Sequence, residues 1–165
     1  MARTLREDAH LPAEGWSRWV RAMVPEPEEM VGQNYEPRSD GQTGVKCTNI
    51  NTILSDEMAQ CGIYEWRAVK PNGDGPKVVY LGSTCRAKPG SLKNRILEYC
   101  TNGSHKEDLI NEALERQYKL EFRVKPTVAH AKVAAENWEN ELLESYDYAW
   151  NFRNNEKSTI RQILR

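Results

Sequence analysis

The chain has 165 residues, of which 39% are hydrophobic and 28% charged, and its formal net charge is −1 at pH 7. This length predicts one globular core and argues against two full domains. A mean hydropathy of −0.77, without a long apolar run, argues against a membrane protein. Charges of both signs in residues 1–8 argue against a secretory signal, so we expect an intracellular protein.

The N-terminal third predicts a helix followed by a loop. Large apolar residues recur in residues 14–24 at steps of three and four, which is typical of one helix face: Trp16, Trp19, Val20 and Met23. The prolines in residues 25–27 end this helix, and the glycines and polar residues of 32–44 indicate a loop. We therefore expect residues 1–58 to be an N-terminal extension that covers the main domain or presents a surface to a protein partner.

The central part of the chain predicts a hairpin and two helices. Residues 61–69 and 77–82 are rich in β-formers and are separated by a turn with prolines and glycines, which favours two paired strands. A helix is expected over residues 91–100, with Leu92, Ile96 and Tyr99 on one face. A second helix is expected over residues 104–118.

The C-terminal part predicts a third strand and a long helix. Leu120, Phe122 and Val124 alternate with charged residues, the period of a half-exposed strand. The long helix is expected over residues 128–146. Together these elements predict an α+β domain over residues 59–155, with a small mixed sheet of about three strands flanked by helices, and a tail over 156–165.

The cysteines and a cluster of basic residues are further candidates for a function. The four cysteines contain no C-x-x-C pair, so we expect small buried apolar residues or free thiols, and neither a zinc module nor a disulfide framework: Cys47, Cys61, Cys85 and Cys100. Residues 84–106 carry five cations and one acidic residue. This strip is either a phosphate-binding surface or an ordinary solvated basic face.

Two tripeptides on the predicted hairpin carry a resemblance. The sequence reads Gly62-Ile63-Tyr64 on the first strand and Tyr80-Leu81-Gly82 on the second, and so resembles the GIY-YIG nuclease superfamily. Further matches follow in family order. Residues 92–99 are similar to the helix of bacterial UvrC that carries an arginine and a tyrosine, residues 138–143 are similar to the helix with the metal-binding glutamate, and Asn151 is similar to the closing asparagine.

The resemblance covers residues 60–152. The sequences of residues 79–86 and 141–151 are most similar to those of plant members of the superfamily, of the EFFECTOR OF TRANSCRIPTION type. The resemblance implies a divalent-metal-dependent endonuclease that hydrolyses phosphodiester bonds of DNA, leaves 5′-phosphate and 3′-hydroxyl ends, and acts in the nucleus. The alternatives are an endonuclease that cuts RNA, and a nucleic-acid-binding or protein-interaction module with little turnover.

The resemblance also implies roles for individual residues. Tyr64 is expected to be the general base, and Arg95 and nearby cations would either lower the pKa of its phenol or pair with it. Tyr80 would bind the water or the scissile phosphate, and Arg95 would hold the phosphate oxygens. Glu139 would bind one Mg²⁺ or Mn²⁺ ion, with Glu136 as the alternative ligand.

Further site residues follow from the same comparison. Tyr99 and His105 are expected to orient the nucleophile or contact phosphate, and Asn151 to organise the site. A basic group of residues is expected to contact nucleic acid: Arg86, Lys88, Lys93 and Lys106. Each of these residues also has an ordinary structural explanation, because tyrosine favours sheets and Arg95 can simply pair with Glu98 or Glu139.

Overall fold

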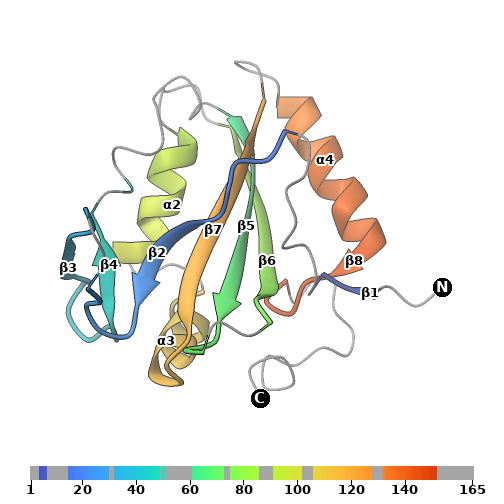
Figure 1. The fold of residues 1–165 in the computed structure, drawn as a ribbon. Helices are drawn as coiled ribbons and strands as arrows, with labels where there is room; N and C mark the ends of the chain where they lie inside the picture. Colours follow the sequence, from blue (N-terminus) through green and yellow to red (C-terminus); the bar gives the residue numbers. More distant parts are fainter. Residues whose placement is uncertain are drawn as a thin grey trace.

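The computed structural model describes residues 4–6, 15–29, 32–48, 50, 61–72, 75–85, 91–101, 106–127 and 132–151, and it has an α+β fold (Figure 1). Its main sheet has six antiparallel strands in the order β3-β4-β2-β7-β5-β6. In chain order these strands are β2 (Val20–Val24), β3 (Tyr35–Pro37), β4 (Val45–Cys47), β5 (Cys61–Val69), β6 (Lys77–Cys85) and β7 (Lys119–Pro126). A separate parallel pair joins β1 (Thr4–Leu5) to β8 (Tyr146–Asp147). The predicted α+β class is confirmed, but the main sheet is antiparallel and larger than expected.

Helices cover both faces of this sheet (Figure 1). They are α2 (Ser91–Thr101), α3 (Glu107–Glu115) and α4 (Lys132–Ser145). Successive residues of a strand point to opposite faces, so Tyr64 and Trp66 of β5 join the core beside α2 and α3. Ile63, from the same strand, joins a second core beside α4. No helix in the described parts of the chain is long and apolar enough to cross a membrane.

The helix predicted over residues 14–24 is wrong. Residues 20–24 form β2, which lies between β4 and β7 in the sheet. The pairing of β2 with β7 shifts register between Arg21 and Met23. Such a bulge breaks the alternation of a strand, which explains how Val20 and Met23 reach the same core in spite of their three-residue spacing. Strands β2, β3 and β4 of the predicted N-terminal extension are thus part of the main sheet.

The prediction of a half-exposed third strand is also wrong. Strand β7 has β2 and β5 as neighbours, and its charged residues Glu121 and Arg123 are buried together with its apolar ones. The guanidinium of Arg123 lies 4.4 Å from the ring centroid of Trp16 and 4.7 Å from that of Trp19. The two tryptophans lie in the non-helical segment before β2, and their rings cover a buried charged residue of the sheet.

The remaining elements agree closely with the sequence. The predicted hairpin is β5 paired with β6, and the predicted helix over residues 91–100 is α2. The other two helices are shorter than expected, at Glu107–Glu115 and Lys132–Ser145. The predicted domain boundary near residue 58 and the tail over 156–165 lie outside the described residues.

Candidate functional site

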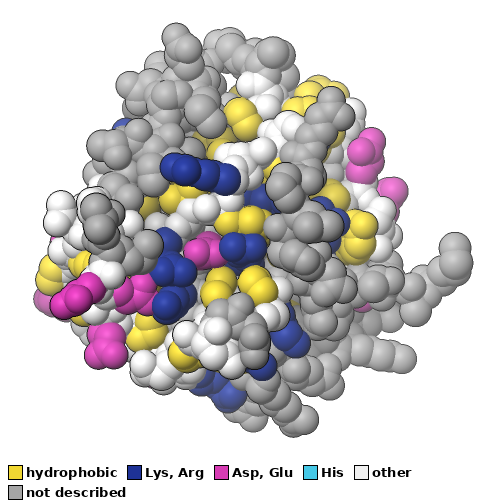
Figure 2. All heavy atoms as spheres, viewed as in Figure 1, with side chains coloured by type: hydrophobic (Ala, Val, Ile, Leu, Met, Phe, Trp, Pro, Cys, Tyr) yellow, Lys and Arg dark blue, Asp and Glu magenta, His cyan; other side chains and the backbone are white. Residues whose placement is uncertain are grey.

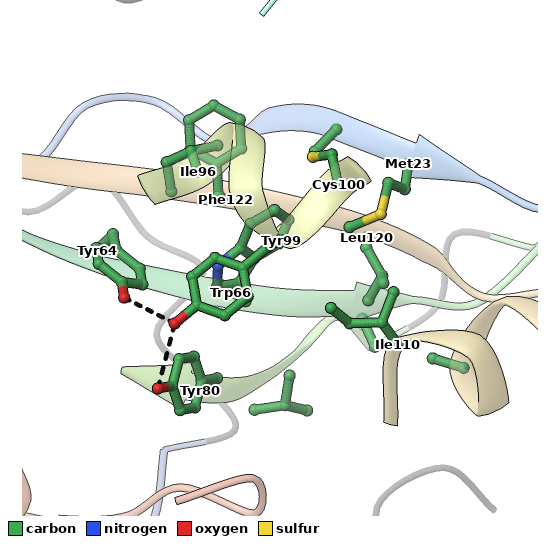
Figure 3. Packing of buried hydrophobic residues seen from close by; sticks show 14 of the residues in the cluster. Met23, Tyr64, Trp66, Tyr80, Ile96, Tyr99, Cys100, Ile110, Leu120 and Phe122 are labelled. Carbon is green, nitrogen blue, oxygen red and sulfur yellow. Dashed lines mark hydrogen bonds between the residues drawn. The ribbon is translucent and has the colours of Figure 1, made fainter. Parts of the chain in front are cut away.

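Three tyrosines from three elements converge beside α2 (Figure 3). The Tyr64 hydroxyl of β5 lies 2.8 Å from the Tyr99 hydroxyl of α2, and Tyr99 donates a hydrogen bond of 3.3 Å to the Tyr80 hydroxyl of β6. Strand pairing places Tyr64 opposite Gly82 and Tyr80 opposite Trp66. Because directly paired residues share a face of a sheet, the hairpin brings both predicted tyrosines to the face that α2 covers.

Gly82 allows the Tyr64 ring to occupy this place. A Cβ atom at Gly82 would lie 2.4 Å from both Cζ and the hydroxyl oxygen of Tyr64. That distance is far below van der Waals contact, and the Tyr64 ring is buried and cannot swing away. The glycine of the second tripeptide is therefore required by the close approach of the tyrosine of the first.

Arg95 of α2 lies at one end of the tyrosine cluster. Its Nε donates to the Tyr64 hydroxyl at 3.3 Å, and its Nη1 donates to Glu98 at 3.1 Å. The guanidinium also lies 5.4 Å from the ring centroid of Tyr99. The Arg95 side chain is 31% exposed, so a ligand at the surface can reach it.

Burial controls the acidity of the phenols. Desolvation is the largest cause that raises the pKa of Tyr64, to about 12, and its hydrogen bonds with Tyr99 and Arg95 oppose it only in part. Burial also raises the pKa of Tyr80 and that of Tyr99. Of the two alternatives expected for Tyr64, the structure has the pairing with Arg95 and not a lowered pKa. Desolvation of the phenolate raises the pKa by more than the nearby cation lowers it.

Glu139 and Glu136 have different surroundings on α4. Glu139 is half-buried and accepts a hydrogen bond from the Ser83 hydroxyl of β6. Burial, and secondarily the charge of Glu136, raise the pKa of Glu139. Glu136 is exposed, with its carboxylate 3.8 Å from the ammonium of Lys132. Of the two carboxylates, Glu139 is the one directed at the hairpin.

The surroundings of Glu139 fit one hard divalent cation. The ion pairs formed among the described residues do not include Glu139, so its carboxylate charge is not matched by a lysine or arginine there. Mg²⁺ and Mn²⁺ prefer oxygen donors and keep several water ligands, so a single carboxylate can hold them. Among the described residues, no three His, Cys, Asp or Glu side chains form a cluster that could hold a metal ion.

Asn151 contacts the backbone of β6. Its Oδ1 accepts from the Leu81 amide at 3.0 Å and its Nδ2 donates to the Leu81 carbonyl at 2.8 Å, while the Trp150 amide donates to the Val79 carbonyl at 2.8 Å. Because β6 is an edge strand of the main sheet, these bonds satisfy backbone groups that no further strand pairs with. Asn151 thus holds the strand that carries Tyr80 rather than reaching into the cluster itself.

The predicted basic residues separate in the structure. Lys106, expected to contact phosphate, is buried, donates to the Trp150 carbonyl and lies 5.2 Å from the ring centroid of Tyr80. Lys93 is half-exposed on α2. Three predicted site residues lie outside the described residues: Arg86, Lys88 and His105.

Two features of the site were not predicted from the sequence. Ser83, which bonds Glu139, directly follows the second tripeptide but belongs to no motif of its own. Cys61 and Cys85 form a disulfide, so the expectation of free thiols is wrong for this pair. Their positions gave a usable signal, because the register that pairs Tyr64 with Gly82 also pairs Cys61 with Cys85. Cys47 and Cys100 are free and buried, as expected.

A hairpin with one tyrosine on each strand, a helix that supplies an arginine and a second helix that supplies a carboxylate are consistent with a nuclease-type domain. A family model described as GIY-YIG domain-containing protein matches residues 29–164, and the chain belongs to this family. Comparison with curated proteins and with solved structures gave no significant match. A nuclease-type domain implies a nucleic acid as its substrate.

Proposed function

We propose that the protein is a divalent-metal-dependent endonuclease that hydrolyses phosphodiester bonds of DNA and leaves 5′-phosphate and 3′-hydroxyl ends. The observation that carries this proposal is the convergence of Arg95 with the hydroxyls of Tyr64 and Tyr80 on the hairpin of the family motif. Glu139 approaches the same hairpin through Ser83. The arrangement offers hydrogen-bond donors for a phosphate and an oxygen ligand for a metal ion within one hairpin and two helices.

Each group has a role in this reaction. Arg95, a permanent cation with planar donors, binds the phosphate oxygens and stabilises the negative charge that grows on them in the transition state. The phenol hydroxyls orient the attacking water and accept its proton. Glu139 would hold Mg²⁺ or Mn²⁺, and the bound ion would neutralise charge on the leaving oxygen. Arg86, Lys88 and Lys93 are proposed to contact the nucleic-acid backbone, whose affinity would then fall with added salt.

The test is cleavage of supercoiled plasmid and, in parallel, of a structured RNA, with Mg²⁺, Mn²⁺ or a chelator. We expect metal-dependent nicking or linearisation of the plasmid by the wild type and its loss in Glu139→Gln. Glu136→Gln is the matched control, since it alters the exposed carboxylate one helical turn away, and it should cleave like the wild type.

The other outcomes each contradict part of the proposal. Cleavage of the RNA alone would replace the substrate. Binding of either nucleic acid in chelator, without cleavage in any metal, would favour a binding module. Cleavage by Glu139→Gln at the rate of the wild type would show that the metal ligand is not Glu139.

A further inference from the structure

A pocket lies on the face of the sheet that α4 covers, opposite the face with the tyrosine cluster. Its volume is about 230 Å³. The residues that line it come from β5, β7, α4 and the segment before β2, and they include Trp16, Ile63, Lys125, Trp138, Glu141 and Ser145. None of these side chains has a role in the reaction proposed above.

Two tryptophans from different elements form walls of this pocket. Trp138 lies on the same face of α4 as Glu141 and Ser145, because residues three and seven positions apart are neighbours on a helix surface. Trp16 lies in the segment before β2, which crosses the sheet toward α4 (Figure 1). The Ser17 amide donates to the Val124 carbonyl at 2.8 Å, and the Val124 amide donates to the Ser17 hydroxyl at 2.9 Å. These bonds hold the segment on β7, so both indoles are in place before a ligand binds.

The pocket also carries two opposite charges that do not pair with each other. The ammonium of Lys125 lies 4.2 Å from the ring centroid of Trp138, and the exposed side chain of Glu141 lies at the rim. Among the described residues, neither the ammonium nor the carboxylate takes part in a salt bridge or a side-chain hydrogen bond. Lys125 can therefore donate to an oxygen of a ligand, and Glu141 can accept from an amino group.

The size and the chemistry of the pocket fit one nucleobase. Pockets that enclose a whole drug-sized ligand have about 300–1,000 Å³, so this smaller one takes a single planar ring system and leaves the rest of the ligand outside. Aromatic side chains stack on the face of any base, and a carboxylate such as Glu141 can accept from the amino group of a base. Cages for methylated lysine also use tryptophan, but the ammonium of Lys125 already lies over Trp138 and would repel a second cation.

The pocket is next to Glu139, the proposed metal ligand. Strand pairing places Ser83, Ile63 and Lys125 in one row across β6, β5 and β7. Glu139 accepts from Ser83 at one end of this row, and Ile63 and Lys125 line the pocket. Neighbouring strands are about 4.8 Å apart, so a phosphate at Glu139 and a base in the pocket can belong to the same or to adjacent nucleotides.

We propose that this pocket binds an unpaired DNA base next to the bond that is cleaved, with the base stacked on Trp138 and Trp16 and with Lys125 on the adjoining backbone. This inference rests on the proposed nuclease function and specifies its substrate. A base inside a duplex is stacked on both sides and must leave the stack to enter a pocket. The preferred substrate is therefore DNA with an unpaired nucleotide rather than a perfect duplex.

The first experiment measures binding in chelator, so it does not depend on cleavage. The probes are a fluorescent DNA duplex with one unpaired adenine and the same duplex with an abasic site at that position. Stacking of one base changes affinity by about 5- to 150-fold, so the wild type should bind the adenine probe more tightly by a factor in this range. Trp138→Leu should lose most of this preference, and Trp138→Phe, which keeps an aromatic ring, should retain part of it. Equal binding of the two probes by the wild type would overturn the proposal.

Trp19→Leu is the matched control. Trp19 packs against the same apolar cluster as Trp138, but its ring lies on Arg67 and Arg123 and does not line the pocket. This variant should keep the wild-type preference, with circular dichroism to show that each variant is folded. A loss of preference as large as that of Trp138→Leu would overturn the proposal, because the effect would then follow the apolar cluster and not the pocket.

Lys125→Gln tests the pocket without removing an aromatic ring. It should weaken binding of both probes and lower the slope of log affinity against log salt concentration by about 1, as expected for the loss of one phosphate contact. A salt dependence equal to that of the wild type would contradict the role of Lys125.

Cleavage of the same probes in Mg²⁺ separates this inference from the proposed function. The wild type should cut the adenine probe faster than the abasic one, and Trp138→Leu should cut the two at similar rates. A preference in binding without any cleavage would contradict the nuclease and support the base pocket. Equal binding and equal cleavage of the two probes would overturn the pocket in an active nuclease. Binding of a trimethyl-lysine peptide that Trp138→Leu abolishes, without a preference between the probes, would replace the base by a protein ligand.

Discussion

The two faces of strand β5 bury polar groups in different ways. On the face that α4 covers, Glu65 is fully buried and accepts from Arg123 at 2.9 Å, from Arg6 at 3.2 Å and from Tyr148 at 2.7 Å. On the opposite face, Arg95 donates to a chain of neutral phenols. The first network surrounds a buried carboxylate with two guanidinium groups, whereas in the second a half-buried guanidinium that also pairs with Glu98 contacts neutral phenols.

We assign the Glu65 network to the stability of the fold and the tyrosine face to the chemistry of the site. The Glu65 network joins β5 to β7 through Arg123, and through Arg6 and Tyr148 it holds to the sheet the residues that directly follow β1 and β8. Neighbouring cations on this side are also paired, as Arg67 and Arg21 are with Glu121. Figure 2 shows lysine, arginine and acidic side chains next to one another on this side of the molecule. On the tyrosine face, Arg95 pairs with Glu98 but its side chain is 31% exposed, so a ligand at the surface can still reach it.

The largest expected effect breaks the matched network. Glu65→Gln leaves Arg123 buried without its counter-charge, and loss of one partner of a buried ion pair costs about 3–5 kcal/mol of unfolding free energy. Urea unfolding followed by circular dichroism measures this cost. Glu36→Gln is the control, because its carboxylate is 46% exposed beside Lys46, and it should change stability by less than about 1 kcal/mol. Equal effects of the two substitutions would contradict the structural role of the Glu65 network.

The next effect concerns the disulfide that joins β5 to β6, the two strands of the hairpin. Cys61 and Cys85 close a loop across 24 positions, and a cross-link of this length stabilises a domain by about 3 kcal/mol, chiefly through the unfolded state. Unfolding with and without a thiol reductant measures the difference. The double variant Cys61→Ser/Cys85→Ser should be insensitive to reductant. If wild type and double variant respond alike, the disulfide does not form in solution.

A smaller effect is expected from the tyrosine face. Tyr99→Phe removes the hydroxyl between two buried phenols, and this should cost about 1–2 kcal/mol because both neighbours lose a partner. Tyr118→Phe should be close to neutral. Thermal unfolding compares the stabilities of the two variants, each of which lacks one tyrosine hydroxyl. A neutral Tyr99→Phe would mean that the phenol chain contributes nothing to folding and would leave only its chemical role to test.

The smallest expected effect is an increase in stability, from the replacement of Glu139. Burial raises the pKa of Glu139, so the folded protein binds that proton more tightly than the unfolded chain, and the wild type gains stability as pH falls through the raised pKa. Above it the buried charge is a penalty, which Glu139→Gln removes. We expect this variant to be up to about 1 kcal/mol more stable at pH 8, with a gain that shrinks in acid, and to be inactive. A melting temperature below that of the wild type at pH 8 would contradict this assignment, and Glu136→Gln should match the wild type.

The sequence predicted the elements whose signals are local. Runs of β-formers and the turn residues between them located the hairpin of β5 and β6, and a helical face with Ile96 and Tyr99 located α2. The same reasoning failed for β2, where a bulge produced spacing typical of a helix. It also failed for β7, because alternating charges look exposed unless a partner such as Glu65 for Arg123 is known. Partners distant in sequence were the part that local patterns did not contain.

By itself, the sequence determined the family motif, the α+β class and the residue types available for chemistry, since these depend on short-range order along the chain. Only the tertiary structure decided that Tyr64 is too buried to have a lowered pKa, that Lys106 lies inside the molecule, and that the Tyr99 hydroxyl lies between those of Tyr64 and Tyr80. The physical reason is that acidity and hydrogen-bond direction depend on desolvation and on neighbours that folding brings together. The motif thus indicates which residues take part, and their packing decides what each of them can do.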